Sequence, residues 1–554
     1  MRSTALYPND AALRTANSSR RKRQVGDQPQ KLRFHRTALS NLSPSDQDLF
    51  EAFGQGPVCA PRFPLIHRAF EFWAARRPDA VAAEHLGQTI TYGELERQAT
   101  RLALRLQALG VRPGDNVALF LRRSIPMLVG ILASLKVGAA YVPQDARLAP
   151  EVQLRHIVSV AKTRVILTLS EFEDAIPVAE GHQVIAIDRL RAETADADAG
   201  LGLSRALRPE DTCFVLFTSG TTGTPNGVQV THRNVCNILL TPPGDLGIRP
   251  GLKVAQILCI AFDMAAWEIL GALANGATLV IRGSDVTDAA ARSDVVIATP
   301  SILGSMDIER CRNVKVAAVA GEPCPRPLAD AWSSFATFYN ACGPTETTIV
   351  NTAQRYDRSC ASLTIGAPTP NNTVYVLDQG LRPCRIGEVG EMWAGGCGVS
   401  KGYLDNDALN AERYLPDPFI GGSARMFRTR DLGRWTPEGE LEHLGRTDDQ
   451  VKVRGFRVEL DGISSVLETA AGCMKAVTLK LDERTLVSFV SPGSVDTRDA
   501  MARVAAALPY YCVPACVIAR EALPLTGRGK VDKALLMAEA AAHAGTAIGR
   551  TVGT

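Results

Sequence analysis

The sequence predicts an α/β fold in which mixed and parallel sheets are covered by helices. Short apolar runs of strand length alternate with amphipathic segments over residues 64–281, an order typical of parallel sheets packed against helices. The 554 residues exceed what one core usually holds, since single cores rarely grow beyond about 300 residues. After about residue 446 the segments become shorter, which indicates a second, small α+β domain at the C-terminal end.

Composition and charge restrict the class of protein. Hydrophobic residues are 46% and charged residues 21% of the chain, as in soluble globular proteins. A net charge of +3 gives no reason to expect nucleic acid or a membrane surface as a partner. The 13 cysteines are scattered singly, without the paired spacing of disulfide frameworks or zinc sites. No apolar stretch approaches the ~20 residues of a membrane span, so we expect a cytoplasmic protein.

The first elements can be placed in order from the N-terminus. Residues 1–45 are polar, carry the basic run 20–23 and show no hydrophobic period, which predicts a disordered tail. Residues 66–76 and 92–109 have the pattern of amphipathic helices, the second ending at Gly110. Buried strands are expected at 117–121, 165–169, 184–187, 254–260 and 278–281, with helices at 125–135 and 267–274.

A loop rich in hydroxyls and glycines follows the apolar run 213–217. Its sequence over residues 217–232 is FTSGTTGTPNGVQVTH. Hydroxyl groups and a freely turning glycine backbone can bring donors close to a bound anion. The Gly-x-x-x-x-Gly-Lys-Ser/Thr spacing is absent, which argues against an ordinary nucleoside triphosphatase. The alternative is a solvated turn, but the residue order favours a phosphate site made by Thr218, Ser219, Gly220, Thr221, Thr222 and Gly223.

This loop resembles T-S-G-T-T-G-x-P-K-G of the adenylate-forming superfamily, which includes nonribosomal peptide synthetase adenylation domains, acyl-CoA synthetases and luciferases. Further stretches match the superfamily in its order: ITYGEL (90–95), LKVGAAYVPQD (135–145), FDMAAWEI (262–269), AGEP (320–323), NACGPTET (340–347), MFRTRDLGRW (426–435), GRTDDQVKVRGFRVEL (445–460) and LPLTGRGKVDK (523–533). The resemblance covers residues 60–540. It implies a large adenylation domain (46–446) and a mobile lid domain (447–540), between the tail 1–45 and a flexible tail 541–554.

The resemblance also implies roles for individual residues. Lys530 would neutralise charge during adenylation, Glu346 would hold Mg²⁺, and Thr218 with its neighbours would bind the phosphates of ATP. Asp431 and Arg446 would approach the ribose, and Asp448 would be the hinge. The adenine side would be formed by Gly321, Glu322, Pro323, Asn340, Cys342, Gly343 and Thr345. The chain departs from the family pattern at Asn226, where Lys is usual, at Cys342, where an aromatic ring is usual, and at Arg430, where Gly is usual.

Asp263 lies at the edge of an apolar stretch, one helical turn before Trp267. Read from the residues alone, it caps a helix. The resemblance implies instead that it pairs with the α-ammonium of an amino acid, which needs a counter-charge in an apolar pocket. Alignment to the family gives the acid pocket as Asp263, Met264, Trp267, Ile297, Ala318, Ala320, Ala341, Ile349 and Val350. This mostly apolar set favours a bulky hydrophobic or aromatic α-amino acid.

The expected function is ATP-dependent activation of such an amino acid as its aminoacyl adenylate, with release of pyrophosphate. Thioester transfer to a phosphopantetheinyl carrier protein or a downstream synthetase in trans would follow, since no L-G-G-x-S carrier motif follows in this chain. A stand-alone ligase that uses coenzyme A or an amine is one alternative. A catalytically decayed nucleotide-binding relative is another, favoured by Asn226, Cys342 and Arg430. Retention of Asp263, Glu346, Asp431 and Lys530 favours an enzyme.

Overall fold

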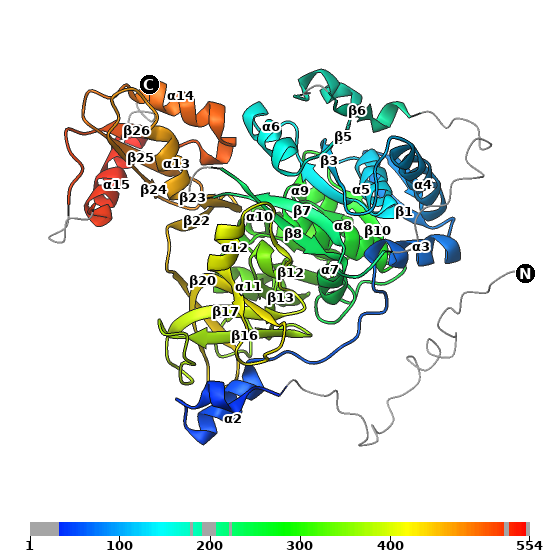
Figure 1. The fold of residues 1–554 in the computed structure, drawn as a ribbon, viewed down its shortest axis with the longest axis horizontal. Coiled ribbons are helices and arrows are strands. Elements are labelled where there is room, and N and C mark those ends of the chain that lie inside the picture. The colour runs from blue at the N-terminus through cyan, green and yellow to red at the C-terminus, as the bar shows by residue number, and fades with distance from the viewer. Residues whose placement is uncertain (1–32, 178–180, 191–206, 221–223, 526–530, 550–554) are drawn as a thin grey trace, which may run out of the picture.

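The computed structural model describes residues 33–177, 181–190, 207–220, 224–525 and 531–549. Two large sheets form its centre (Figure 1). The seven-stranded sheet is parallel from β7 to β6 and antiparallel at its other edge. Its spatial order is β18 (Gly402–Tyr403), β8 (Asn226–Thr231), β7 (Thr212–Thr218), β4 (Ala140–Gln144), β3 (Asn116–Phe120), β5 (Val165–Thr168) and β6 (Gln183–Ala186).

The nine-stranded sheet is parallel through its middle, with antiparallel strands at both edges. Its order is β15 (Ala367–Pro368), β14 (Thr352–Tyr356), β13 (Thr337–Cys342), β12 (Val316–Val319), β11 (Val295–Ala298), β9 (Lys253–Gln256), β10 (Thr278–Ile281), β1 (Val81–His85) and β2 (Gln88–Thr91). The parallel strands are apolar and buried, as expected for strands covered by helices on both faces.

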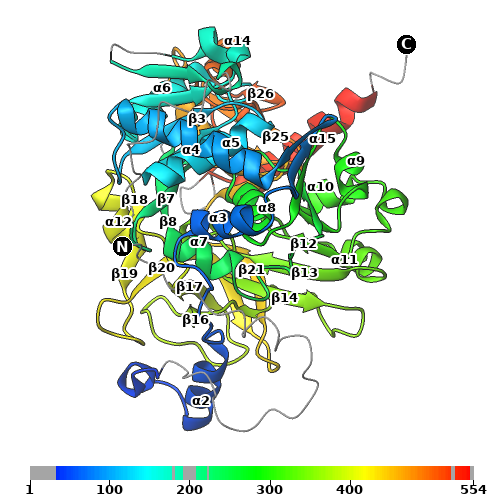
Figure 2. The same ribbon diagram turned by 90° about the vertical axis from the view of Figure 1, so that its right-hand side faces the viewer.

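Helices fill the space between the two sheets and cover their outer faces (Figure 2). In α5 (Ile125–Val137) every residue from Met127 onward is buried, and in α8 (Asp263–Ala274) every residue from Met264 onward is buried. Each helix is apolar on all sides, which is typical of a helix inside a core. Both belong to the core that joins β3 to β9 and β10. The others in this region are α3 (Ile66–Arg76), α4 (Tyr92–Ala108), α6 (Glu151–Val160), α7 (His232–Leu239), α9 (Val286–Ala291), α10 (Pro300–Gly304), α11 (Arg326–Ser333) and α12 (Asp407–Arg413).

A third, five-stranded sheet carries the N-terminal segment on its surface. The sheet contains β16 (Asn372–Leu377), β17 (Gly390–Gly396), β20 (Arg425–Trp435), β19 (Tyr414–Pro416) and β21 (Leu441–Arg446). Short helices at Arg36–Leu39 and α2 (Pro44–Phe53) lie against it, at the lower end in both views (Figures 1 and 2). The expectation of disorder to residue 45 is therefore wrong for residues 33–45. Phe34, Leu39 and Phe50 are buried against Tyr375 and Phe419 of this part of the molecule.

The C-terminal part forms a smaller unit with its own core, drawn in orange and red (Figure 1). It contains the hairpin β22 (Gln450–Val453) and β23 (Phe456–Glu459), then α13 (Leu460–Leu467), β24 (Lys475–Lys480), β25 (Leu486–Ser491), α14 (Thr497–Ala507), β26 (Cys516–Ala519) and α15 (Lys533–Gly549). Helix α15 continues to Gly549. The flexible tail expected from residue 541 is therefore helical as far as residue 549. Within the described residues, no helix has the length and apolar character needed to cross a membrane.

Candidate active site

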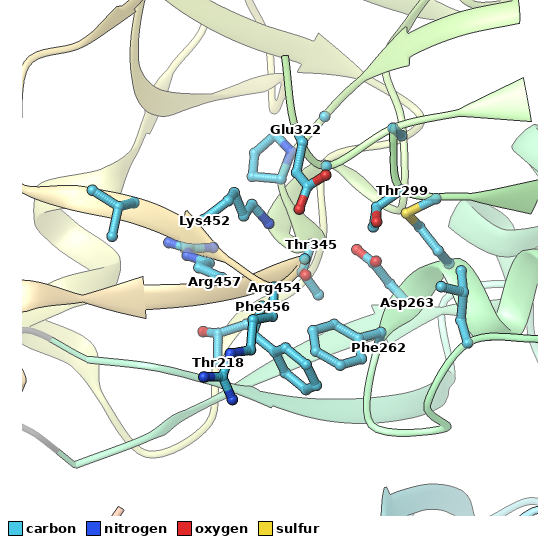
Figure 3. A pocket seen from close by; sticks show the side chains of 18 of the residues that line it. Thr218, Phe262, Asp263, Thr299, Glu322, Thr345, Lys452, Arg454, Phe456 and Arg457 are labelled. Atoms are coloured by element: carbon cyan, nitrogen blue, oxygen red, sulfur yellow. The ribbon is translucent and has the colours of Figure 1, made fainter. Parts of the chain in front are cut away.

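One cavity of 1210 Å³ lies where the two large sheets and the small C-terminal unit meet. The residues that follow β4, β7, β9 and β12 line it, as expected for α/β sheets, which bind ligands at the carboxyl ends of their strands. The β22–β23 hairpin closes it from the other side. Figure 3 shows Lys452, Phe456 and Arg457 of this hairpin on one side of the cavity and Asp263 and Thr299 on the other.

Most of the predicted site residues line this one cavity. They are Thr218, Ser219, Asp263, Met264, Ala320, Gly321, Glu322, Pro323, Asn340, Ala341, Cys342, Gly343, Thr345, Ile349, Asp431, Arg446 and Asp448. Gly220 lies beside a small adjoining pocket. Thr221, Thr222, Gly223 and Lys530 lie outside the described residues.

Some predicted members of the acid pocket lie behind the cavity wall instead. Trp267, Ile297, Ala318 and Val350 are buried but do not line the cavity. The indole of Trp267 donates a 2.6 Å hydrogen bond to the carbonyl of Gly244, which fixes the ring in the core. Ile297 and Ala318 face one another in register on β11 and β12. These side chains therefore support the pocket from behind, and Met264, Ala320 and Ile349 form its apolar surface.

Asp263 presents its carboxylate to the cavity. It is the first residue of α8, and the N-cap position is taken by Phe262 without a side-chain capping bond. The helix-cap interpretation is therefore wrong. Burial within the cavity wall raises the pKa of Asp263, against a hydrogen bond with Thr345 and the charge of Lys452. A cation that bound beside Asp263 would favour its ionised form.

The described part of the predicted phosphate loop is in contact with the small C-terminal unit. The hydroxyl of Ser219 donates a 3.0 Å hydrogen bond to the carbonyl of Arg457 in β23. At Gly220 an added Cβ would lie 2.3 Å from the carbonyl oxygen of Thr224, so this position needs glycine. Asn226, which stands in place of the usual lysine, pairs with Thr218 across β7 and β8 and accepts a 3.0 Å hydrogen bond from Asn406.

The carboxylate of Glu346 is fully buried and already paired. Nη1 of Arg457 donates to its two oxygens at 3.2 and 3.0 Å, and the hydroxyl of Tyr403 donates to it at 2.6 Å. Burial acts to raise the pKa of Glu346, but the charges of Arg457 and Arg413 and the hydrogen bond from Tyr403 together outweigh it, and the pKa is lowered. Arg457 and Tyr403 were missed by the sequence analysis. Basic and apolar residues alternate in 451–457, a pattern typical of a half-exposed strand, whereas Lys452 and Arg457 face the cavity.

A metal ion needs an open carboxylate oxygen, and Glu346 does not offer one in this arrangement. In the described part of the chain, no group of three or more His, Cys, Asp or Glu side chains has the arrangement of a metal site. Mg²⁺ beside phosphates usually needs only one or two carboxylates. Glu346 nevertheless does not fit the predicted metal here, because Arg457 binds both of its oxygens.

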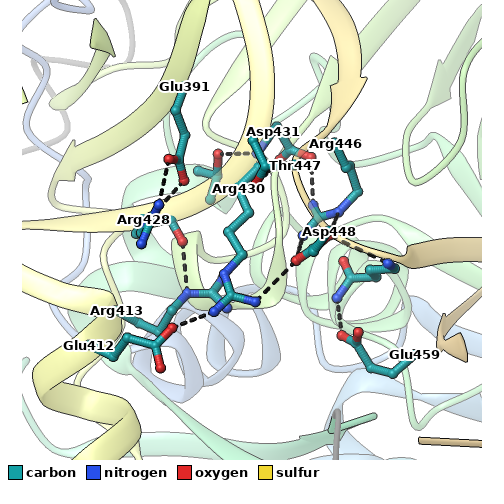
Figure 4. Close-up of polar contacts among 12 residues, drawn as sticks. Glu391, Glu412, Arg413, Arg428, Arg430, Asp431, Arg446, Thr447, Asp448 and Glu459 are labelled. Carbon is teal, nitrogen blue, oxygen red and sulfur yellow. Dashed lines mark hydrogen bonds and ion pairs between the residues drawn. The ribbon is translucent and has the colours of Figure 1, made fainter. Parts of the chain in front are cut away.

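Asp431 and Asp448 belong to one network of ion pairs (Figure 4). Arg446 donates to Asp431 at 2.5 Å and, through Nε, to Asp448 at 2.8 Å. Arg430 has a φ of 63°, the left-handed region that explains why glycine is usual there. Its guanidinium pairs with Glu412 and, at 3.4 Å, with Asp448. Arg430 therefore supports the predicted hinge and does not replace the cation that is missing at Asn226.

The predicted adenine side of the cavity has a thiol and one carboxylate oxygen without a hydrogen-bond partner among the described residues. Burial raises the pKa of Cys342 to about 12, so the thiol stays protonated and presents a small apolar surface. Oε2 of Glu322 accepts a 2.9 Å hydrogen bond from the amide of Ser301, while its buried Oε1 has no partner among the described residues. Such an atom needs a hydrogen-bond donor, which a bound ligand can supply.

Comparison with known proteins gives one consistent family. The model of the family described as AMP-binding enzyme matches residues 70–404. The chain is 44% identical over 507 residues to adenylate-forming reductase 03009 of Coprinopsis cinerea, covering 90% of this chain and 49% of that protein. It is 37% identical to the isonitrile lipopeptide synthase of Mycobacterium tuberculosis, covering 84% of this chain and 19% of that protein. The chain thus spans about half the length of the fungal reductases it matches.

Solved structures confirm the predicted fold class. NpsA-ThdA from Klebsiella oxytoca, an artificially fused adenylation and PCP protein, superposes with a TM-score of 0.72 at 26% identity and covers 82% of this chain and 93% of its own. Holo-PA1221, which contains adenylation and PCP domains, has a TM-score of 0.76 at 23% identity and covers 89% of this chain and 85% of its own.

Proposed function

The chain belongs to the AMP-binding enzyme family, and from this premise we propose that it activates an α-amino acid with ATP. The products are an aminoacyl adenylate and pyrophosphate. The family as a whole supports adenylate formation on a carboxylate. The choice of an amino acid rests on one observation, which is the position of Asp263. Its carboxylate faces the cavity, caps no helix and has apolar neighbours at Met264, Ala320 and Ile349.

In this proposal one side of the cavity binds the amino acid and the other side binds ATP. The ammonium of the amino acid would bind Asp263. This contact would orient the carboxylate of the amino acid toward the phosphate loop at Thr218 and Ser219. Asp431 and Arg446 would bind the ribose. The carboxylate oxygen attacks the α-phosphorus, a new C–O–P linkage forms, and the bond to the bridging oxygen of pyrophosphate breaks. Because no proton has to move in this step, position and charge supply the catalysis.

The arrangement of the small C-terminal unit must change before ATP can use this site. Arg457 holds Glu346, and its carbonyl holds Ser219. We propose that the unit turns about Asp448, which frees both side chains and brings Lys530 to the reacting carboxylate. Such closure is a common way to complete a catalytic site. Glu346 would be available for Mg²⁺, which supplies positive charge beside the phosphates, only in that second arrangement.

The acyl group would then pass to the thiol of a phosphopantetheinyl carrier protein in trans. The structures of adenylation and PCP proteins support this acceptor. A second candidate for the fate of the adenylate is reduction by a further domain. The support for it is the 44% identity to proteins named adenylate-forming reductases, of which this chain spans about half. Both candidates share the activation step at Asp263.

Exchange of labelled pyrophosphate into ATP tests the activation step. Each of the common amino acids and several aryl acids would be assayed with the wild-type chain, with Asp263→Asn and with the control Asp288→Asn, a half-exposed side chain on α9. We expect exchange with one apolar amino acid. Asp263→Asn should lower kcat/KM about 10- to 150-fold, the range for losing a charged hydrogen bond. Equal exchange by Asp263→Asn, or equal exchange with acids that lack an amine, would disprove the amino-acid assignment.

A further inference from the structure

Arg430 adopts a backbone conformation that is rare for an arginine. Its φ is 63°, in the left-handed region that favours glycine, although the residue stands within the long strand β20. A residue with a side chain persists in this region only where the surrounding contacts hold it there. The partners of Arg430 therefore indicate which part of the fold requires an arginine at this position.

The guanidinium group of Arg430 bridges two carboxylates from different parts of the molecule (Figure 4). Nη2 pairs with Glu412 on α12, in the large domain. Nη1 pairs at 3.4 Å with Oδ2 of Asp448, two residues before β22 of the small C-terminal unit. The side chain of Arg430 is 23% exposed, so solvent screens these charges only in part. Glu412 thus directs the guanidinium group toward the start of the small unit.

The backbone of Arg430 binds the same connecting segment. Its carbonyl accepts a 2.9 Å hydrogen bond from the amide of Thr447 and a 3.2 Å hydrogen bond from the hydroxyl of that residue. The next residue of β20, Asp431, pairs with Arg446 on β21. Residues 446–448 are therefore all attached to β20. Because the chain leaves the large domain at this segment, these contacts fix the direction in which the β22–β23 hairpin begins.

Asp448 keeps its negative charge in this network. Burial acts to raise the pKa of Asp448, but the hydrogen bond and charge of Arg446, the charge of Arg430 and the amide of Gln450 lower it. Among the residues that the structure describes, Arg446 and Arg430 are the cations paired with Asp448. Arg446 is two residues away in the chain, whereas Arg430 belongs to another strand. A turn of the chain about Asp448 would therefore break the contact with Arg430.

We propose that Arg430 is a positioning residue that holds the small C-terminal unit in its docked arrangement, with the β22–β23 hairpin at the cavity, and that Glu412 acts through it. The inference rests on the proposed function, in which the unit turns about Asp448 before ATP is used. Loss of the Arg430 contact raises the fraction of molecules that have turned. Since only that fraction exchanges pyrophosphate, the rate at saturating substrates rises in proportion to it.

Arg430→Asn tests this role on the full chain, because asparagine tolerates the left-handed region and has no charge. Hydrogen–deuterium exchange at residues 450–459, without substrates, measures the docked fraction. Pyrophosphate exchange at saturating ATP and amino acid measures the turned fraction. We expect both rates to rise about 2- to 5-fold, the range for losing a partly exposed ion pair. A merely structural role would instead lower the kcat of pyrophosphate exchange.

Glu412→Gln provides a second variant if Arg430→Asn does not fold, since it keeps the arginine and removes the group that directs it. Its effects should have the same sign, and they should disappear when Arg430 is already replaced by asparagine. Arg292→Asn is the matched control. Arg292 also bridges two carboxylates, Glu84 and Asp288, and it does not line the cavity, so neither rate should change.

Three results would overturn the proposal. The first is unchanged deuterium exchange at residues 450–459 in both Arg430→Asn and Glu412→Gln. The second is additivity of the two changes, which would mean that Glu412 does not act through Arg430. The third is faster deuterium exchange with slower pyrophosphate exchange, which would assign Arg430 to the turned arrangement. Faster deuterium exchange in a chain that shows no pyrophosphate exchange at all would support the role of Arg430 and refute the proposed activation.

Discussion

Replacing Arg457 by methionine should release the β22–β23 hairpin from the large domain while both domains stay folded. Removing one partner of a buried ion pair typically costs about 3–5 kcal/mol. The lower end applies here. The hydroxyl of Tyr403 should still donate to Glu346 after the change, as it does now at 2.6 Å. The buried Nε of Arg457 has no hydrogen-bond partner among the described residues and lies 4.0 Å from Glu459, so part of its burial penalty disappears. A loss of about 3 kcal/mol is roughly a hundredfold in the docking equilibrium.

Hydrogen–deuterium exchange at residues 450–459 measures this equilibrium. Amides of the hairpin should exchange roughly a hundredfold faster in Arg457→Met, with no change in the buried strands β3 and β9. Arg454→Met, an exposed position in the same hairpin, is the control. Glu346→Gln combined with Arg457→Met should show strong coupling, since the two side chains act on one contact. Unchanged exchange in Arg457→Met, or simple additivity in the double variant, would refute this reasoning.

Further predictions concern the thiol and the buried titratable groups. Cys342→Tyr places a ring on the predicted adenine side and should tighten AMP binding several-fold, on the order of 1 kcal/mol for a ring contact. Calorimetry that shows no gain in AMP affinity would count against the adenine assignment. The pKa of Glu346 is lowered in the fold, so its contribution to stability is full above the ordinary value of 4.5 and is lost as the pH falls. Urea unfolding of Glu346→Gln should therefore depend less on pH than wild type in acid, and an equal slope contradicts this. Burial lowers the pKa of His232 from 6.5 to about 4. As the pH drops between these values the unfolded chain binds a proton that the folded chain does not, so the stability of the fold decreases. His232→Gln should make stability less dependent on pH in this range, which urea unfolding midpoints measure.

The regular elements could be predicted where periodicity is strong. Helix α3 has the predicted limits, α4 ends one residue earlier than expected, and β10 coincides with the predicted strand. The N-terminal segment could not be predicted in this way. Its buried residues Phe34, Leu39 and Phe50 are widely spaced and follow no helical or strand period, because each fills a separate position on a sheet made much later in the chain.

Site residues could be predicted from the sequence where a family motif follows directly after a strand. Arg457 was not, because its partner Glu346 is 111 residues away in the sequence and the pattern of its strand indicates solvent on one face. A strand that faces a polar cavity shows the same alternation of polar and apolar residues as a strand that faces solvent, so the pattern does not distinguish the two.

The N-terminal segment that packs on the five-stranded sheet belongs to the folded domain, although none of its residues lines the cavity. Phe34 and Phe50 cover Tyr375 and Phe419, and the four rings belong to one buried cluster. A chain shortened to begin beyond Phe53 would keep every residue of the cavity, yet its five-stranded sheet would expose an aromatic patch of the kind that drives self-association. Substitutions in this segment should accordingly alter the yield of soluble protein rather than the rate of any reaction at the cavity.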